Sequence, residues 1–119
     1  MIEDDALAIT EKMKDAQVIV WATPIYYYEI SGQMKTLIDR ANSLYPTNYA
    51  FRDIYLLSAA AEEEEGVDEG AIHGLNGWIA CYERARLAGT VFAGGVNEAG
   101  EIQRHPAIQK AFEMGKSIS

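Results

Sequence analysis

Tyrosines and small residues follow two apolar segments of the chain, and these residues are the best suited to chemistry. The segment from Thr23 to Tyr27 follows the apolar run Val18–Ala22, and Ser58–Ala61 follows Ile54–Leu57. A tight turn exposes backbone amide and carbonyl groups, and a tyrosine ring can cover the face of a planar ligand. A proline in the first turn stiffens it, which reduces the ordering entropy lost on binding. The two loops are therefore candidates for binding a flat ring with a hydrogen-bonding edge.

Other readings of these residues stay open. Tyr26, Tyr27 and Tyr28 are also consistent with ordinary packing between helices. The acidic run Glu62–Glu65 is typical of a solvated loop, and near a site it repels phosphate groups. His73 and His105 have no ligand partners at metal spacing. We therefore assign no catalytic side chain and no metal site.

The elements that must position these loops alternate between helix and strand. Val18–Ala22 is continuously apolar and β-branched, as in a strand buried on both faces, and Thr23-Pro24 should end it. The apolar spacing of other segments predicts four helices: Asp5–Ala16, capped by Asp4 or Asp5; a helix from the N-cap Ser31 to Ala41; Gly70–Leu87; and a last helix from Pro106 onward. Two further strands are predicted over Ile54–Leu57 and Thr90–Ala93. Gly89 is expected to end the third helix as its C′ glycine. The last helix should turn Ile108, Ala111, Phe112 and Gly115 inward.

This alternation predicts an α/β fold with a parallel sheet, right-handed crossovers and helices on both faces. In such sheets ligands bind beyond the carboxyl ends of the strands. Those ends are expected at Thr23-Pro24, Ser58-Ala59 and Gly94-Gly95.

Composition limits the partners. The chain has 119 residues, enough for one domain, with 18 acidic and 10 basic side chains and a formal net charge of −8. An acidic surface repels nucleic acid and anionic membranes. Cys81 is the single cysteine, no apolar run is long enough for a membrane span, and Met1–Asp5 does not resemble a signal peptide. These features indicate a cytoplasmic protein.

Two adjoining segments carry a specific pattern. The first is the apolar run Val18–Ala22 followed by Thr23-Pro24-Ile25-Tyr26, and the second is Ser31-Gly32-Gln33-Met34-Lys35-Thr36-Leu37-Ile38-Asp39-Arg40. The pair resembles the flavodoxin-like NADPH-dependent FMN reductases, which include the iron–sulfur flavoproteins and whose pattern is an apolar strand, then [ST]-P-x-Y, then S-G-x-[ML]-K-x-x-[IL]-D-R. The resemblance implies a flavodoxin-like three-layer αβα fold, truncated here to about three strands and four helices.

The resemblance also implies a function. Family members are FMN-dependent oxidoreductases that use NAD(P)H to reduce a flavin or another small acceptor, and hydride transfer belongs to the cofactor. The positions that match the family's flavin loops are Thr23, Pro24, Ile25, Tyr26, Tyr27, Ser58, Ala59 and Ala60.

The match departs from the family at its start. Relatives carry a first strand and a phosphate-binding loop, and the iron–sulfur branch also carries a cysteine cluster; nothing similar occurs before Val18. We therefore expect residues 1–119 to form a single, N-terminally incomplete domain. Two alternatives to an enzyme follow: a non-enzymatic interaction module, or half of a split flavoprotein.

An incomplete sheet also predicts a partner. Without the family's first strand, Val18–Ala22 becomes an apolar edge, and such edges pair with other chains. We expect a homo-oligomer that covers this edge, with antiparallel contact between two-fold related strands.

Overall fold

The computed structural model describes residues 2–118, in which helices and parallel strands alternate. No helix in this range is long and apolar enough to cross a membrane. The elements are α1 (Ala6–Asp15), β1 (Val18–Pro24), α2 (Gly32–Arg40), β2 (Asp53–Ala59), α3 (Glu69–Ile79), β3 (Arg86–Ala93) and α4 (Pro106–Ser117), with short 3₁₀ turns at Ala41–Leu44 and Glu101–Arg104.

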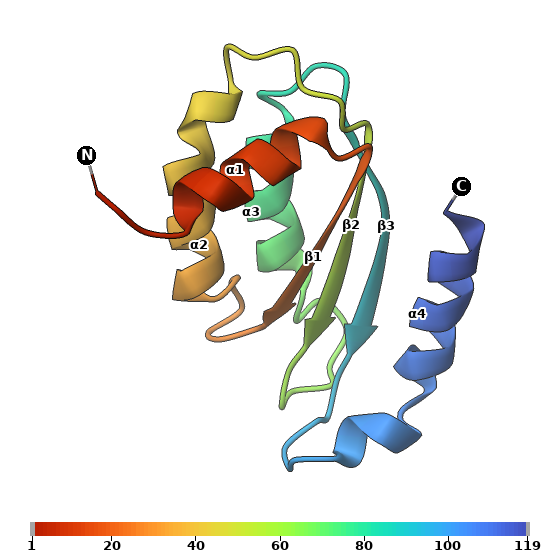
Figure 1. Cartoon of the computed structure of the whole chain (residues 1–119). Coiled ribbons are helices and arrows are strands. Elements are labelled where there is room, and N and C mark those ends of the chain that lie inside the picture. The colour runs from red at the N-terminus through yellow and green to blue at the C-terminus, as the bar shows by residue number, and fades with distance from the viewer. Residues whose placement is uncertain (1, 119) are drawn as a thin grey trace.

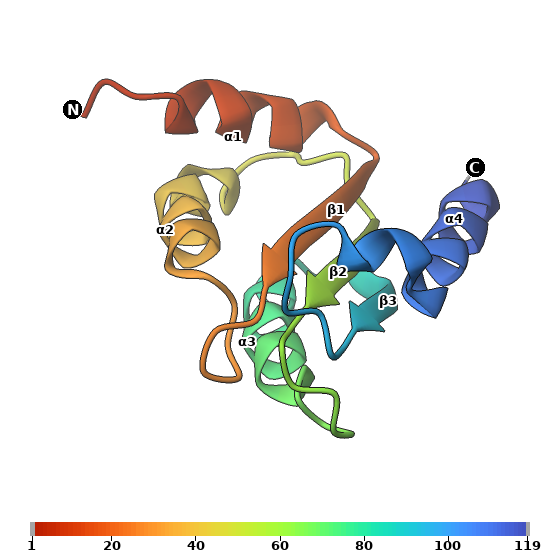
Figure 2. The same cartoon turned by 90° about the horizontal axis from the view of Figure 1, so that it is seen from below.

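The three strands form one parallel sheet in the order β1-β2-β3. Val18 is paired with Asp53 at one end of β1, and Pro24 is paired with Ala59 at the other. Helices α1, α2 and α3 lie on one side of this sheet and α4 lies on the other (Figure 1, Figure 2). The predicted αβα layers and the parallel sheet are confirmed.

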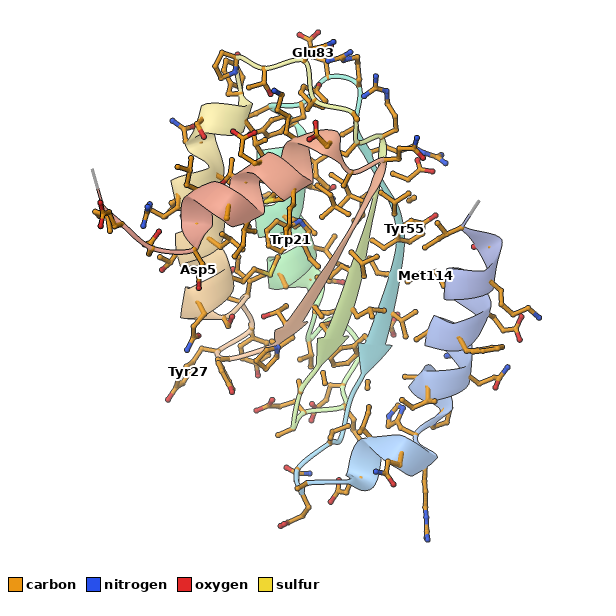
Figure 3. All side chains as sticks on the ribbon, in the orientation of Figure 1. Asp5, Trp21, Tyr27, Tyr55, Glu83 and Met114 are labelled. Atoms are coloured by element: carbon orange, nitrogen blue, oxygen red, sulfur yellow. The ribbon has the colours of Figure 1, made fainter. Side chains whose placement is uncertain are left out.

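The core lies between the sheet and the layer of α2 and α3. Alternate β1 residues point into it: Ile19 and Trp21 are buried, whereas Val20 between them is 48% exposed. Trp21 meets Trp78 of α3 edge to face, with ring centroids 5.7 Å apart. The largest fully buried side chains are Phe51, Leu44, Ile54, Leu56 and Leu75. Within residues 2–118, α4 covers the opposite face of the sheet, and Tyr55 and Met114 lie between β2 and this helix (Figure 3).

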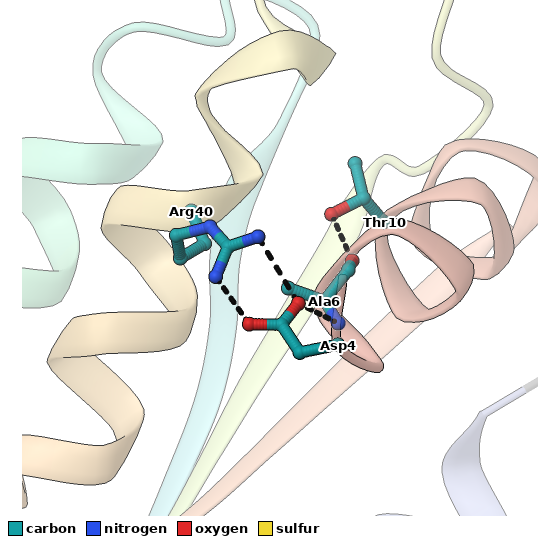
Figure 4. Close-up of polar contacts among 4 residues, drawn as sticks. All are labelled: Asp4, Ala6, Thr10 and Arg40. Atoms are coloured by element: carbon teal, nitrogen blue, oxygen red, sulfur yellow. Dashed lines mark hydrogen bonds and ion pairs between the residues drawn. The ribbon is translucent and has the colours of Figure 1, made fainter. Parts of the chain in front are cut away.

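An ion pair joins the start of α1 to the end of α2 (Figure 4). Both carboxylate oxygens of Asp4 accept from the guanidinium of Arg40, and one also accepts from the backbone N–H of Ala6 at 3.0 Å. The bond from Arg40 lowers the pKa of the Asp4 carboxyl. Asp4 therefore supplies the predicted capping oxygen, and Asp5 makes no side-chain cap.

All three strands run further than predicted, β3 because it begins at Arg86 instead of Thr90. Pro24 is the last residue of β1 instead of its terminator, and β2 continues through Ser58 and Ala59. The Ile25 N–H donates to the Ala59 carbonyl at 2.8 Å. Because successive residues of a strand alternate in hydrogen-bonding direction, the missing N–H of Pro24 falls on the side away from β2, so the pairing of these two strands loses no hydrogen bond.

The third helix is shorter than predicted. It ends at Ile79 instead of Leu87, and Gly89 lies inside β3, which begins at Arg86. A tight turn from Ile79 to Tyr82 buries the Tyr82 ring against Trp78, at a centroid distance of 5.0 Å. Gly89 has a packing role, because a Cβ there would lie 3.0 Å from Met114 Sδ of α4.

The last helix begins where the sequence predicts, but a different set of its side chains faces the sheet. Pro106 occupies its first turn. The predicted inward stripe is right at Ala111 and wrong at its other three positions: Phe112 is 59% exposed, and Ile108 and Gly115 are also exposed. Helix α4 rests on β3 through the neighbouring stripe of Ala107, Ala111 and Met114, whose spacing follows one helix face.

Candidate functional site

A pocket of about 750 Å³ opens where the carboxyl ends of the three strands converge. Three loops contribute to it, one from each strand, as expected for an open parallel sheet. It is lined by Pro24, Ile25, Tyr26, Tyr27, Tyr28, Ala59, Ala60, Ala61, Glu62, Val96 and Asn97.

A strained two-residue turn forms the first wall of the pocket. Tyr26 and Glu29 exchange both backbone hydrogen bonds, at 3.2 and 3.1 Å, and enclose Tyr27 and Tyr28. The φ angles of these two tyrosines are +51° and +67°, in the left-handed region that non-glycine residues rarely adopt. Strain of this kind costs roughly 1–3 kcal/mol per residue and is concentrated at functional sites. Tyr27 is 97% exposed and projects from this end of the molecule (Figure 3).

Neighbouring elements hold this turn in place. Thr23 Oγ1 donates to the Pro24 carbonyl at 2.8 Å and accepts from the Ser31 N–H at 3.0 Å. Ser31 Oγ accepts from the Met34 N–H at 3.2 Å, which confirms the predicted cap of α2. At Gly70 in α3, a Cβ would lie only 2.3 Å from the Tyr28 carbonyl oxygen. The absence of a side chain there lets α3 approach the turn closely.

The loops after β2 and β3 pack tightly against each other to form the second wall. The Ala60 N–H donates to the Ala93 carbonyl at 3.0 Å, and the Val96 N–H donates to the Ala60 carbonyl at 2.9 Å. A Cβ on Gly94 would lie 2.8 Å from the Glu63 Cα. The small side chains of Ala60 and Gly94 therefore let the two loops pack closely, and the hydrogen bonds between them fix the backbone of this wall.

His105 supports the same wall from α4. Its Nε2 lies 2.9 Å from the Gly94 carbonyl oxygen, and its Nδ1 accepts from the Ala107 N–H at 3.0 Å. An acceptor at Nδ1 and a donor at Nε2 describe one tautomer of the neutral ring. His105 thus caps α4 and ties it to the third loop.

The structure brings together six of the eight residues predicted from sequence. Pro24, Ile25, Tyr26, Tyr27, Ala59 and Ala60 line the pocket. The side chains of Thr23 and Ser58 are buried, and both residues border a second groove, of about 420 Å³, between the sheet and α4. Thr23 is a positioning residue, because its hydroxyl bonds only to backbone groups of the turn.

Ala61, in the predicted loop Ser58–Ala61, also lines the pocket, and the sequence reasoning missed four lining residues. Tyr28 and Glu62 extend the two predicted loops, and Val96 and Asn97 come from the third. The signal for the last two was present, because Gly94-Gly95 marks the carboxyl end of β3 and such ends converge.

Charge around the pocket is negative. Glu62 is its only charged lining residue, Glu63–Glu65 continue the loop in exposed positions, and no lysine or arginine of the described chain lines the pocket. The pocket thus combines backbone polar groups, tyrosines and small apolar residues, which suits a flat and largely uncharged ring.

Comparison with known proteins gives matches over most of the chain. The family model described as NADPH-dependent FMN reductase matches residues 2–82. An iron-sulfur flavoprotein of Methanosarcina thermophila is 28% identical over 115 residues, which cover 96% of this chain and 57% of that protein. YwqN of Bacillus subtilis, provisionally named an NAD(P)H-dependent FMN-containing oxidoreductase, is 30% identical over 97% of this chain and 67% of its own length.

Solved structures match the fold. An NAD(P)H:quinone oxidoreductase from Methanothermobacter marburgensis superposes with a TM-score of 0.71 at 16% identity, over 98% of this chain and 63% of that protein. The Trp repressor binding protein of Bacillus subtilis gives a TM-score of 0.74 at 21% identity, over 90% and 72% of the two chains. The chain spans little more than half of the Methanosarcina thermophila relative and about a quarter of an Archaeoglobus fulgidus iron-sulfur flavoprotein. With its parallel αβα layers and the match over residues 2–82, the chain has a flavodoxin-like fold and belongs to the NADPH-dependent FMN reductase family.

Proposed function

We propose that this chain acts as an FMN-dependent NAD(P)H oxidoreductase that reduces a small-molecule acceptor, with the flavin ring in the pocket at the carboxyl ends of the strands. One observation carries the proposal: a pocket of about 750 Å³ lies between the strained tyrosine turn and the small residues Ala59–Ala61. Membership of the FMN reductase family supports the same ligand. The cytoplasm, where NAD(P)H is available, is the compartment we propose.

The residues present fit one part of FMN better than the other. Tyr26 and Tyr27 can cover the ring, and the backbone around Ile25 and Ala60 offers donors and acceptors to its edge. The phosphate has no equivalent partner, because no lysine or arginine of residues 2–118 lines the pocket and Glu62 repels it. We therefore attribute flavin affinity on this chain to the ring.

The chain's own residues bind and orient the ring and exclude water from it. The Thr23 hydroxyl fixes the Pro24 carbonyl, and the α2 cap at Ser31 fixes the Thr23 hydroxyl. When bound, the flavin supplies the hydride-transfer chemistry, so the protein needs no acid–base side chain for it. This matches a pocket whose one carboxylate, Glu62, lies on an acidic rim of exposed residues.

A titration of FMN and riboflavin fluorescence with the purified chain tests the proposal. We expect both flavins to be quenched with affinities within about tenfold of each other, because a phosphate without a partner contributes little. The variant Ala61→Trp should fill the pocket and abolish quenching, whereas Ala80→Trp, an exposed alanine after α3, should leave it unchanged. The proposal fails if neither flavin is quenched at high protein concentration.

The acidic loop favours one alternative, a flavin-binding module without turnover. Glu62 lines the pocket and Glu63–Glu65 are exposed beside it, and four carboxylates there repel a phosphate-bearing donor. An assay of NAD(P)H oxidation with saturating FMN separates the two functions. Quenching with turnover supports the oxidoreductase, and quenching without turnover supports the module.

A further inference from the structure

We propose that His105 is a positioning residue of the pocket: it holds the second wall, formed by the loops after β2 and β3, and it acts through the Gly94 carbonyl. The link from His105 to ligand binding rests on the proposed flavin site, whereas the link from His105 to the wall does not. The proposal follows from the bonds of the imidazole, the place of Gly94 between the two loops, and the separate tasks of the two ring nitrogens.

The imidazole of His105 has a defined tautomer and orientation. The Ala107 N–H lies 3.0 Å from Nδ1 and can only donate, so Nδ1 is an acceptor. The proton of the neutral ring therefore lies on Nε2, which donates to the Gly94 carbonyl oxygen at 2.9 Å. His105 is half-buried, and both of its polar atoms are engaged. One side chain thus connects the start of α4 to the loop after β3, at the carboxyl end of the sheet (Figure 1).

Gly94 is the point at which the two loops meet. A Cβ on Gly94 would lie 2.8 Å from the Glu63 Cα and 2.9 Å from the Glu62 carbonyl oxygen. The next residue, Gly95, donates its N–H to the same Glu62 carbonyl at 3.2 Å. Because packing this close leaves no free space, a displacement of the Gly94 carbonyl must move both loops. The bond from His105 therefore bears on the whole wall.

The loop after β3 carries such a displacement into the pocket. Val96 and Asn97 follow Gly94 in this loop, and both line the pocket. The Asn97 N–H donates to Glu101 Oε2 at 3.0 Å, so a second side chain holds the other end of the loop. Loss of the His105 bond should therefore loosen the wall without releasing it.

A helix cap is the competing role of His105. Nδ1 performs it, because it accepts from an N–H in the first turn of α4 that has no partner within the helix. Nε2 performs the positioning role. An asparagine side chain keeps an acceptor at the cap and loses the donor to Gly94, whereas the longer glutamine side chain keeps a donor within reach of Gly94 and loses the cap. The two substitutions therefore separate the two roles.

Amide hydrogen exchange of the wild type, His105→Asn and His105→Gln tests the proposal without a ligand. The reporters are the N–H groups of Gly95 and Val96, which donate to the loop after β2 at 3.2 and 2.9 Å. His105→Asn should speed their exchange roughly threefold to tenfold, as for the loss of one hydrogen bond, and His105→Gln should leave it unchanged. At the Ala107 N–H the order should be reversed, because only His105→Gln removes its acceptor.

Riboflavin titration of the same three chains tests the link to the pocket. His105→Asn should raise the dissociation constant roughly threefold to tenfold, and His105→Gln should change it by less than about twofold. If the wild type quenches no flavin, the proposed function fails, and hydrogen exchange alone decides whether His105 holds the wall.

Two results overturn the inference. One is exchange at Gly95 and Val96 that is as slow in His105→Asn as in the wild type, which is the behaviour expected of a helix cap alone. The other is a wall that loosens in His105→Asn while the riboflavin affinity stays at the wild-type value, because the wall would then not bear on the ligand.

Discussion

A substitution at Tyr27 should affect the stability of the fold and ligand binding in opposite directions, because the tyrosine ring is 97% exposed while its backbone is strained. Tyr27→Gly removes a left-handed penalty of roughly 1–2 kcal/mol and adds roughly 0.5–1 kcal/mol of glycine entropy. We expect the free energy of unfolding to rise by about 1 kcal/mol or less while flavin quenching weakens. Urea denaturation and fluorescence titration measure the two effects.

Tyr45→Gly is the matched control for this change. Tyr45 is also exposed, but its backbone lies in the ordinary helical region, at φ −52° and ψ −48°. Glycine there should lower the free energy of unfolding by about 0.5–1 kcal/mol and leave flavin binding intact. Equal stability changes at the two positions would contradict strain at Tyr27.

Two glycines of α3 should respond oppositely to the same substitution. Gly70→Ala places a Cβ 2.3 Å from the Tyr28 carbonyl oxygen, so the turn must move, and we expect a loss of about 1–3 kcal/mol. Gly77→Ala meets nothing within 4 Å and should stabilise the helix by about 0.5–1 kcal/mol. Chemical denaturation of both variants measures the difference. Stabilisation by Gly70→Ala would show that the turn does not pack against α3 as described.

The Tyr82 hydroxyl should make stability depend on alkaline pH. Burial raises its pKa in the folded chain, so the unfolded chain loses this proton first as the pH rises past about 10. The contribution is fully present below the unfolded pKa and is lost as the pH climbs toward the folded pKa. Compared with Tyr82→Phe, the wild type should lose stability more steeply between about pH 9 and 11. Parallel pH profiles in urea denaturation would contradict this.

The loop between β2 and α3 should control which nicotinamide donor reaches the site. If the chain turns over NAD(P)H, Glu62→Gln should lower KM for NADPH more than for NADH, because NADPH carries an extra phosphate. We expect roughly a twofold to fivefold change at low salt, as for an exposed charge interaction of about 0.4–1 kcal/mol.

Glu83→Gln provides the electrostatic control for the loop. It makes the same change in net charge at the opposite end of the sheet (Figure 3) and should leave both KM values unchanged. An equal response to Glu62→Gln and Glu83→Gln would mean that net charge, and not the loop, governs donor binding.

Association of whole molecules should appear in thermal unfolding. If the chain forms the homo-oligomer predicted from its sequence, mass action stabilises the oligomer, so the Tm should rise with protein concentration. Val20→Lys adds a charge to an exposed residue of the strand that the prediction places at the contact, and it should make the Tm independent of concentration. A constant Tm for the wild type across the range in which sedimentation detects a dimer would mean that pairing and folding are not linked.

Local patterns in the sequence were enough to predict the strand at Val18, the cap at Ser31, the start of α4 at Pro106 and the family. Each of the three elements depends on residues close in the chain. The strand at Val18 has a β-branched run, the Ser31 hydroxyl lies three residues before the N–H that it caps, and the ring of Pro106 fixes φ at the start of α4. The resemblance to the family predicted six of the residues that line the pocket, and these six lie together because the carboxyl ends of parallel strands converge.

Only tertiary contacts decided the rest. The third helix stops at Ile79 because Tyr82 finds a buried aromatic cluster, and Gly89 is extended because α4 packs over it. The same packing of α4 on β3 selects Ala107 and Met114 for the buried stripe in place of Ile108 and Phe112. The left-handed tyrosines are held by Thr23 and Gly70, which are distant in sequence from each other. Periodicity and propensity describe neighbours along the chain, and these outcomes depend on neighbours in space.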